Sequence, residues 1–205
     1  MSRMVQVDET GLQVDTIVFQ VDEMKIQVDR IGLQVVPNVK SDKFKVKLME
    51  KSRMKMTCKL EDQPFTSKYQ LKRIDKDDIL KVATTMLEAY KGTVDQQEET
   101  IQEAVLEVEK IINDGYGPFI KEASYWIELN NEAVAVICIN IWNGRPLITE
   151  IFTGINYRRN GFASELIKAS MDVLNQLGYK EIDLNVTKEN LKAVHLYEEL
   201  GFVQN

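Results

Sequence analysis

Two arginines and a glycine stand directly before a predicted amphipathic helix near the C-terminus. Residues 157–164 read Tyr-Arg-Arg-Asn-Gly-Phe-Ala-Ser. The backbone N–H groups of a first helical turn have no partner within the helix, so they favour a bound phosphate or pyrophosphate. Arg158 and Arg159 can add charge-assisted hydrogen bonds, and Gly161, which has no Cβ, lets the backbone approach closely. The segment therefore predicts an anion-binding site.

A second segment places an amide, a small residue and a phenol on one face of a short helix. Asn190, Ala193 or Val194, and Tyr197 are three or four residues apart, and residues at this spacing stack along one side of a helix. A phenol can protonate a leaving group. Taken alone, the first segment fits an ordinary helix start and the second fits a tyrosine that anchors a helix to a sheet. The functional interpretation therefore depends on finding both.

Together the two segments resemble the acyl-CoA-binding motifs of the GCN5-related N-acetyltransferase (GNAT) superfamily, Arg/Gln-x-x-Gly-x-Gly/Ala and Asn-x-x-Ala-x-x-x-Tyr-x-x-x-Gly-Phe. The first matches at residues 158–163 and the second at 190–202. The resemblance covers about residues 67–203. It implies an enzyme that transfers an acetyl group from acetyl-CoA to a primary amine, on a small molecule or a peptide, by direct attack. The alternative is a non-catalytic, truncated acetyltransferase fold that acts as a binding or assembly module.

The resemblance also implies which residues hold the acyl donor. The pantetheine arm pairs with free backbone groups at Ile151, Phe152 and Thr153. Thr153 stands where an aliphatic residue is commoner, but a backbone contact tolerates this difference. Asn190 holds the pantetheine or the start of its own helix, and Tyr197 protonates the departing thiolate. The pyrophosphate lies over Arg158, Arg159, Asn160, Gly161, Phe162, Ala163 and Ser164.

Acetyl transfer also needs an uncharged amine, and Glu150 is the candidate base. It lies in the strand that carries the thioester, and it can act directly or through a water molecule. A carboxylate in such a strand can equally be solvated or ion-paired, so both interpretations stay open. His195 points off the face shared by Asn190 and Tyr197 and is interpreted as helix surface. The sequence shows no metal-binding constellation.

The elements that position these residues follow an α/β (α+β) pattern with a mixed, mostly antiparallel sheet. Hydrophobic periodicity and turn residues predict a strand near 69–74, a helix from Asp75 to Gly92 and a second helix from near Asp95 to Gly115. Three strands, a helix, a strand and a helix follow. Their expected ranges are 124–129, 133–142, 147–153, 162–178, 182–186 and 191–200. This order resembles the acyl-CoA N-acyltransferase fold of the superfamily.

The last strands of that fold are missing from the sequence. Members of the superfamily usually continue after Gly-Phe-Val with two more strands, whereas this sequence ends at Asn205. An unpaired sheet edge favours association, so a homodimer through this edge is expected. A second hypothesis is that strand-like segments near the N-terminus cover the edge, in the same chain or in a neighbour.

Residues 1–66 lie outside the resemblance. Gln-Val-Asp recurs every seven residues from 6–8 to 27–29, and apolar residues alternate within the repeat, which is typical of strands rather than of a coiled coil. The connecting residues suit tight hairpins poorly. Residues 1–40 are therefore either a β-patterned segment or a tandem duplication with no settled fold. Residues 41–66 are interpreted as a hairpin of 44–48 with 54–60, or as a linker, before a domain at 67–205.

Composition sets further bounds. The 205 residues carry 26 basic and 32 acidic side chains, a net charge of −6, which argues against non-specific nucleic-acid binding and mildly favours cationic substrates. Cys58 and Cys138 lie in alternating apolar segments and are expected to be buried thiols in a reducing compartment. No apolar run is long enough to span a membrane, and no signal peptide is visible. We expect a cytoplasmic protein with neither a nucleic-acid nor a membrane partner.

Overall fold

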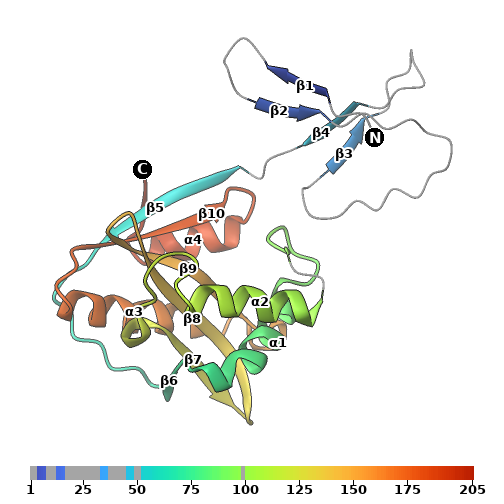
Figure 1. The fold of residues 1–205 in the computed structure, drawn as a ribbon. Helices are drawn as coiled ribbons and strands as arrows, with labels where there is room; N and C mark the ends of the chain where they lie inside the picture. Colours follow the sequence, from blue (N-terminus) through green and yellow to red (C-terminus); the bar gives the residue numbers. More distant parts are fainter. Residues whose placement is uncertain (1–3, 8–12, 17–32, 37–44, 49–51, 98–99) are drawn as a thin grey trace. The chain divides into compact units, whose positions relative to one another are not determined.

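The computed structural model describes residues 4–7, 13–16, 33–36, 45–48, 52–97 and 100–205. The chain divides into two compact units, Met1–Lys51 and Ser52–Asn205, which are described separately (Figure 1). Among the residues described, no helix is long and apolar enough to cross a membrane.

The first unit contains two short antiparallel strand pairs. Strand β1 (Met4–Val7) pairs with β2 (Gln13–Thr16), and β3 (Leu33–Val36) pairs with β4 (Lys45–Leu48). Parts of the seven-residue repeat thus lie in strands, whereas residues 17–32 of the β-patterned segment lie outside the described residues. The hairpin expected between 44–48 and 54–60 is not formed, because β4 pairs with β3 instead.

The second unit is built on a seven-stranded sheet in the order β11-β5-β10-β9-β8-β7-β6. All neighbouring strands run antiparallel except β9 and β10, which run parallel. The predicted mixed, mostly antiparallel sheet is confirmed. Its strands are β5 (Arg53–Lys59), β6 (Leu71–Arg73), β7 (Tyr125–Leu129), β8 (Glu132–Trp142), β9 (Arg145–Thr153), β10 (Glu181–Thr187) and β11 (Val203–Gln204).

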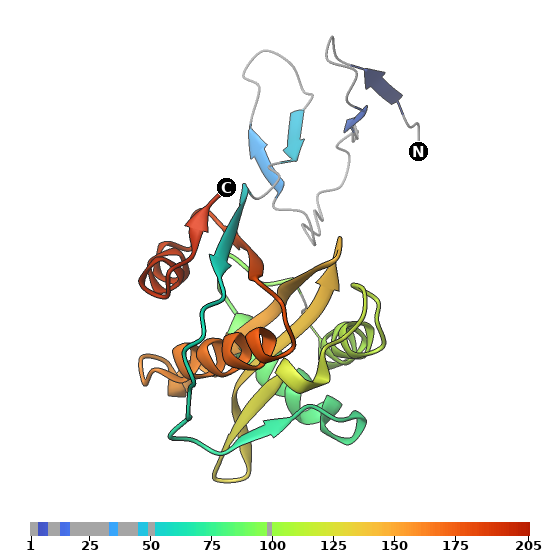
Figure 2. The same cartoon turned by 90° about the vertical axis from the view of Figure 1, so that its left-hand side faces the viewer.

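Two helices cover each face of this sheet, so the domain has two hydrophobic cores (Figure 2). Helices α1 (Ile79–Tyr90) and α2 (Ile101–Ile112) bury one apolar stripe each against the first face, with Val82, Met86 and Val108 almost inaccessible to solvent. Helices α3 (Phe162–Gln176) and α4 (Leu191–Glu199) pack on the second face.

Helix α2 begins later than the sequence pattern predicts. Thr100 and Glu103 form a capping box, in which the Thr100 hydroxyl accepts from the Glu103 N–H and the Glu103 carboxylate accepts from the Thr100 N–H, each at 3.2 Å. Asp95 is therefore not a helix start. It lies in the loop after α1, where its side chain reaches the end of β10.

Strand β5 covers the sheet edge that the sequence pattern leaves open. It pairs with β10 along all seven of its residues, and β11 then pairs with the other side of β5. Apolar residues alternate along 54–60 because every second side chain of β5 faces the core. Met56 and Cys58 are buried there, under α3 and α4. The hypothesis that an N-terminal segment covers the edge is thus confirmed for residues 53–59. The compact unit begins at Ser52 and takes in part of the segment 41–66.

Candidate active site

The parallel strands β9 and β10 separate in the middle of the sheet. They are paired only at Leu147 with Asp183 and at Ile148 with Leu184, although β9 runs on to Thr153 and β10 to Thr187. A bulge at Thr149, where the register of β8 against β9 shifts, accompanies the divergence. Beyond Ile148, β9 remains paired with β8, and its backbone groups on the side of β10 face a gap instead of a neighbouring strand.

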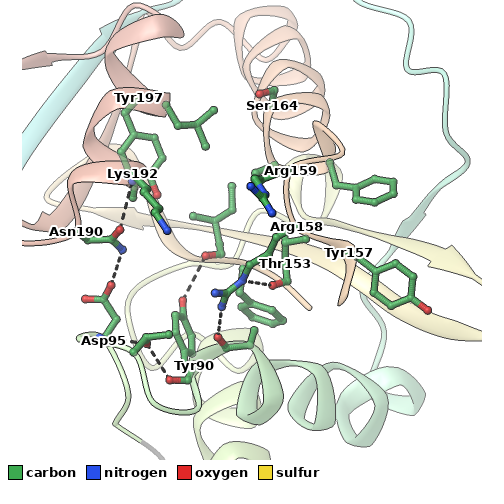
Figure 3. Close-up of a pocket in the computed structure, with 18 of the residues that line it drawn as sticks. Tyr90, Asp95, Thr153, Tyr157, Arg158, Arg159, Ser164, Asn190, Lys192 and Tyr197 are labelled. Atoms are coloured by element: carbon green, nitrogen blue, oxygen red, sulfur yellow. Dashed lines mark hydrogen bonds between the residues drawn. The ribbon is translucent and has the colours of Figure 1, made fainter. Parts of the chain in front are cut away.

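A cavity of about 490 Å³ occupies this region, as Figure 3 shows. Its walls come from the loop after α1, the end of β9, the start of α3 and the start of α4. The structure brings eleven of the residues predicted for the donor site into its lining. They are Ile151, Phe152, Thr153, Arg158, Arg159, Gly161, Phe162, Ala163, Ser164, Asn190 and Tyr197.

Asn160 is the one predicted donor-site residue outside this lining. Its side-chain amide donates to the carbonyl oxygens of Tyr157 at 3.0 Å and Arg158 at 3.2 Å. These bonds hold the turn that leads into α3. The structure thus gives Asn160 a part in shaping the loop.

The start of α3 has the geometry of an anion cradle. Gly161 is the N-terminal cap residue with φ of 80°, and no side chain caps the helix, so the N–H groups of its first turn point to the cavity side without a capping partner. A Cβ at Gly161 would meet no protein atom within 4 Å. The open space beside this backbone is therefore available to a ligand.

The two arginines of the loop are held differently. Arg158 donates to the Ala89 carbonyl at the end of α1 and to the Thr153 carbonyl at 3.4 Å, so it ties the loop to α1 and β9. Arg159 is exposed and adopts a positive φ of 64°. Lys192, in the first turn of α4, adds a third cation to the cavity wall (Figure 3). The sequence pattern did not single out Lys192.

Tyr197 is buried at the inner end of the cavity. Its ring is 7% exposed and packs edge-on against Phe202, with 5.8 Å between the ring centroids. Burial raises the pKa of the Tyr197 phenol well above its usual value, and the nearby carboxylates Glu150 and Asp95 raise it further. The phenol is therefore a proton-bearing group at neutral pH.

A second, smaller cavity of about 130 Å³ shares part of its lining with the first. It shares Tyr90, Asp95, Ile151, Asn190, Ala193 and Tyr197 with the first cavity, and it adds Glu150. The Glu150 carboxylate accepts a hydrogen bond of 2.6 Å from the Tyr90 hydroxyl. Tyr197 thus borders both the cavity at the start of α3 and the cavity that holds Glu150.

Asn190 fixes the start of α4. Its side-chain oxygen accepts from the Ala193 N–H at 3.3 Å, and its amide donates to Asp95 at 2.7 Å. Of the two roles that the resemblance allows, holding the helix start is the one these contacts describe. His195 is exposed and lies 3.2 Å from Glu199, which agrees with its interpretation as helix surface.

Tyr90 and Asp95 are the site residues that the sequence did not reveal. Tyr90 falls on the apolar stripe of α1, and Asp95 stands where a helix start was expected. Burial raises the pKa of Tyr90 well above its usual value, with Glu150 adding to the effect. No local motif marks either residue, because their partners Glu150 and Asn190 are distant in the sequence.

The two cysteines lie outside the linings of both cavities. Cys58 and Cys138 are buried, as predicted, and burial raises the pKa of each thiol. Within the described part of the chain, no group of three or more His, Cys, Asp or Glu side chains is arranged to hold a metal ion.

Comparison with known proteins matches this site to one family. A model of the family described as "Acetyltransferase (GNAT) family" matches residues 85–202, a range that contains both motif segments. A solved structure, a GCN5-related N-acetyltransferase from Sphaerobacter thermophilus, is similar with a TM-score of 0.60 at 16% identity, over 75% of this chain and 48% of that one. At such an identity the likeness is one of fold.

Two curated proteins are similar over shorter stretches. A spermidine N(1)-acetyltransferase of Vibrio cholerae is 43% identical over 56 residues, which is 27% of this chain and 32% of that protein. N-alpha-acetyltransferase 30 of Schizosaccharomyces pombe is 44% identical over 46 residues, 22% of this chain and 31% of that protein. The matched stretches thus span about a third of each curated relative's length.

Proposed function

This chain belongs to the acetyltransferase (GNAT) family, and from this premise we propose that it transfers an acetyl group from acetyl-CoA to a primary amine. The observation that carries the proposal is that Tyr197, a buried phenol, lines both a cavity with an anion cradle and a second cavity with a carboxylate. Direct transfer needs the amine nitrogen to reach the thioester carbon, with a proton donor close to the departing sulfur.

The residues present fit the acyl donor. The N–H groups at the start of α3 and the cations Arg159 and Lys192 suit the phosphates. The backbone of β9 from Ile151 to Thr153 borders the gap between β9 and β10, and its N–H and C=O groups suit the amide groups of the pantetheine arm. The open space at Gly161 leaves room for a close approach of the pyrophosphate.

The proposed reaction involves two proton transfers, one from Tyr197 and one to Glu150. The nitrogen of the uncharged amine forms a bond to the thioester carbonyl carbon, and the carbon–sulfur bond breaks. Tyr197 gives its proton to the departing sulfur, and Glu150 accepts the proton that leaves the nitrogen, directly or through a water molecule. The products are the N-acetylated amine and CoA. General acid and base assistance of this kind contributes roughly 10²–10⁴-fold each.

The acceptor is proposed only at the level of a primary amine. The names of the two curated relatives point to different acceptors, a polyamine for one and protein α-amino groups for the other. Both relatives match over a minor part of their length, so neither acceptor transfers to this chain by similarity. The rival function is a binding module that retains the fold without catalysis.

Thermal unfolding with and without acetyl-CoA tests the proposal. A ligand at about a hundred times its dissociation constant stabilises a two-state protein by roughly 2.7 kcal/mol. We expect this shift for the wild-type protein and its loss in Gly161→Glu, whose carboxylate enters the anion cradle. Release of the CoA thiol with a panel of amines then tests turnover. Acetyl-CoA binding without turnover of any amine would favour the binding-module function.

A further inference from the structure

Strand β5 brings an arginine to the cavity that contains Glu150. Arg53, the first residue of β5, lies directly opposite Thr187, the last residue of β10. Opposite residues of an antiparallel pair project from the same face of the sheet, with Cβ atoms about 4.5–5.5 Å apart. Arg53 accordingly lines the 130 Å³ cavity together with Asp95 and Glu150.

Arg53 differs from the other cations on this face of the sheet. Lys55 lies 2.8 Å from Asp183, and Arg145 lies 2.8 Å from the same carboxylate. Arg53 is exposed and forms no ion pair with any residue in the described part of the chain. Its guanidinium is therefore available to a ligand that enters the cavity.

The opposite wall of the cavity is acidic. Both oxygens of Asp95 accept from neutral donors, from the Thr187 hydroxyl at 2.5 Å and from the Asn190 amide at 2.7 Å. Glu150 accepts from the neutral hydroxyl of Tyr90. The hydrogen bonds that Asp95 accepts come from neutral groups and do not cancel its negative charge, so this wall attracts an ammonium group.

We propose that the acceptor is a small amine that also carries a carboxylate. The ammonium end approaches Glu150 and Asp95 and loses one proton to solvent before transfer, which leaves Glu150 able to accept the second, and the carboxylate end meets Arg53. A diamine or polyamine would instead bring a second positive charge to Arg53. This inference rests on the proposed acetyl transfer and names the acceptor class for that same site.

Amines of matched length test this proposal. The acceptors are the ω-amino acids from β-alanine to 6-aminohexanoate, with n-alkylamines and α,ω-diamines of corresponding length, and kcat/KM is measured from release of the CoA thiol. We expect the kcat/KM of an ω-amino acid of one length to exceed that of its n-alkylamine by up to about fivefold, the upper end for a partly exposed ion pair. In Arg53→Glu this preference should disappear or pass to the diamine.

Lys59→Glu is the control variant. It makes the same charge change at the other end of β5, outside this cavity.

The outcomes separate the two proposals. Equal turnover of the ω-amino acids and alkylamines, preference for the diamines in the wild-type protein, or an unchanged preference in Arg53→Glu would overturn the inference while leaving acetyl transfer intact. Stabilisation by acetyl-CoA with no turnover of any of these amines would also overturn it. Failure of acetyl-CoA to stabilise the protein would overturn acetyl transfer itself, and the inference with it.

Discussion

The carboxylate of Asp95 and the side-chain amide of Asn190 join the loop after α1 to the N-terminal cap of α4 by a hydrogen bond of 2.7 Å. The same carboxylate accepts from Thr187 at the end of β10. Asn190 in turn caps the helix that carries Tyr197. Asp95 therefore links the three elements around the proposed transfer site, and we expect it to position them.

An exchange of the two side chains tests this link. Asn190→Asp places two carboxylates in contact and should lower the free energy of unfolding by about 1–3 kcal/mol, since it breaks a partly buried hydrogen bond. Adding Asp95→Asn should recover most of this loss, because the new amide can donate to the new carboxylate and its oxygen can still accept from Thr187. Urea unfolding of the wild-type protein, both single variants and the double variant gives the coupling energy. Simple additivity of the two single effects would contradict the link.

Tyr197→Phe should separate binding from chemistry. We expect kcat to fall by roughly 10²-fold or more, since the variant removes the proton donor, while the dissociation constant for acetyl-CoA changes little. Tyr116→Phe is a matched control, because its hydroxyl contacts Glu107 and Lys110, away from both cavities. A Tyr197→Phe variant with full kcat would show that Tyr197 only anchors α4.

The sequence predicts the regular part of this fold well. The buried apolar residues of α1, α3 and β10 recur at helical or strand spacing, and β8 is a continuous buried apolar run. The ends of these elements agree with expectation to within a few residues. Most of the residues predicted for the donor side line one cavity, and most of them come from two short segments of the chain. Local periodicity and local motifs supply this information.

The remaining features depend on contacts between distant segments. Nothing near Met56 indicates that its strand pairs with β10 rather than with residues 44–48, since an alternating pattern states which face is buried but not which strand lies beside it. Asp95 likewise has the features of a helix start, but α2 begins after Thr100, which forms a capping box with Glu103. In the wall of the smaller cavity the sequence pattern therefore singled out Glu150 but not Arg53 or Asp95.

Gly161 and Gly178 provide a matched pair for testing the anion cradle. Both have a positive φ, 80° and 91°, and an added Cβ would meet no atom within 4 Å at either position. Alanine should therefore cost each site about 1–2 kcal/mol of stability through backbone strain. Only Gly161→Ala should also weaken acetyl-CoA binding, because its Cβ enters the cavity. Isothermal titration calorimetry with acetyl-CoA measures the dissociation constants of both variants. Equal dissociation constants for Gly161→Ala and Gly178→Ala would show that the pyrophosphate does not bind beside Gly161.

The buried tyrosines predict a loss of stability at high pH. Burial and Glu150 raise the pKa values of Tyr90 and Tyr197 above their value of about 10 in the unfolded chain. Their contribution is fully present below pH 10 and decreases above it, since the unfolded state then releases protons that the native state retains. Each residue should lower the free energy of unfolding by up to about 1.4 kcal/mol per pH unit. Urea unfolding between pH 9 and 11 should show a shallower decrease for Tyr197→Phe than for the wild-type protein.

Truncation tests whether β5 belongs to the domain. A chain that begins at Ser52 should unfold cooperatively, because it keeps the whole seven-stranded sheet. A chain that begins at residue 67 loses Met56 and Cys58, which are 1% and 5% exposed, and it bares the edge of β10. Truncating one buried Met to Ala costs about 2–5 kcal/mol, so losing the whole strand should remove most of a typical 5–15 kcal/mol of stability.

Two point variants in the chain that begins at Ser52 give the matched control. Met56→Ala should lower the free energy of unfolding by the cost of one buried side chain, and Lys59→Ala should change it very little, since Lys59 is exposed on the same strand. Cooperative unfolding of the chain from residue 67 at an unchanged midpoint would show that the sheet is complete without β5.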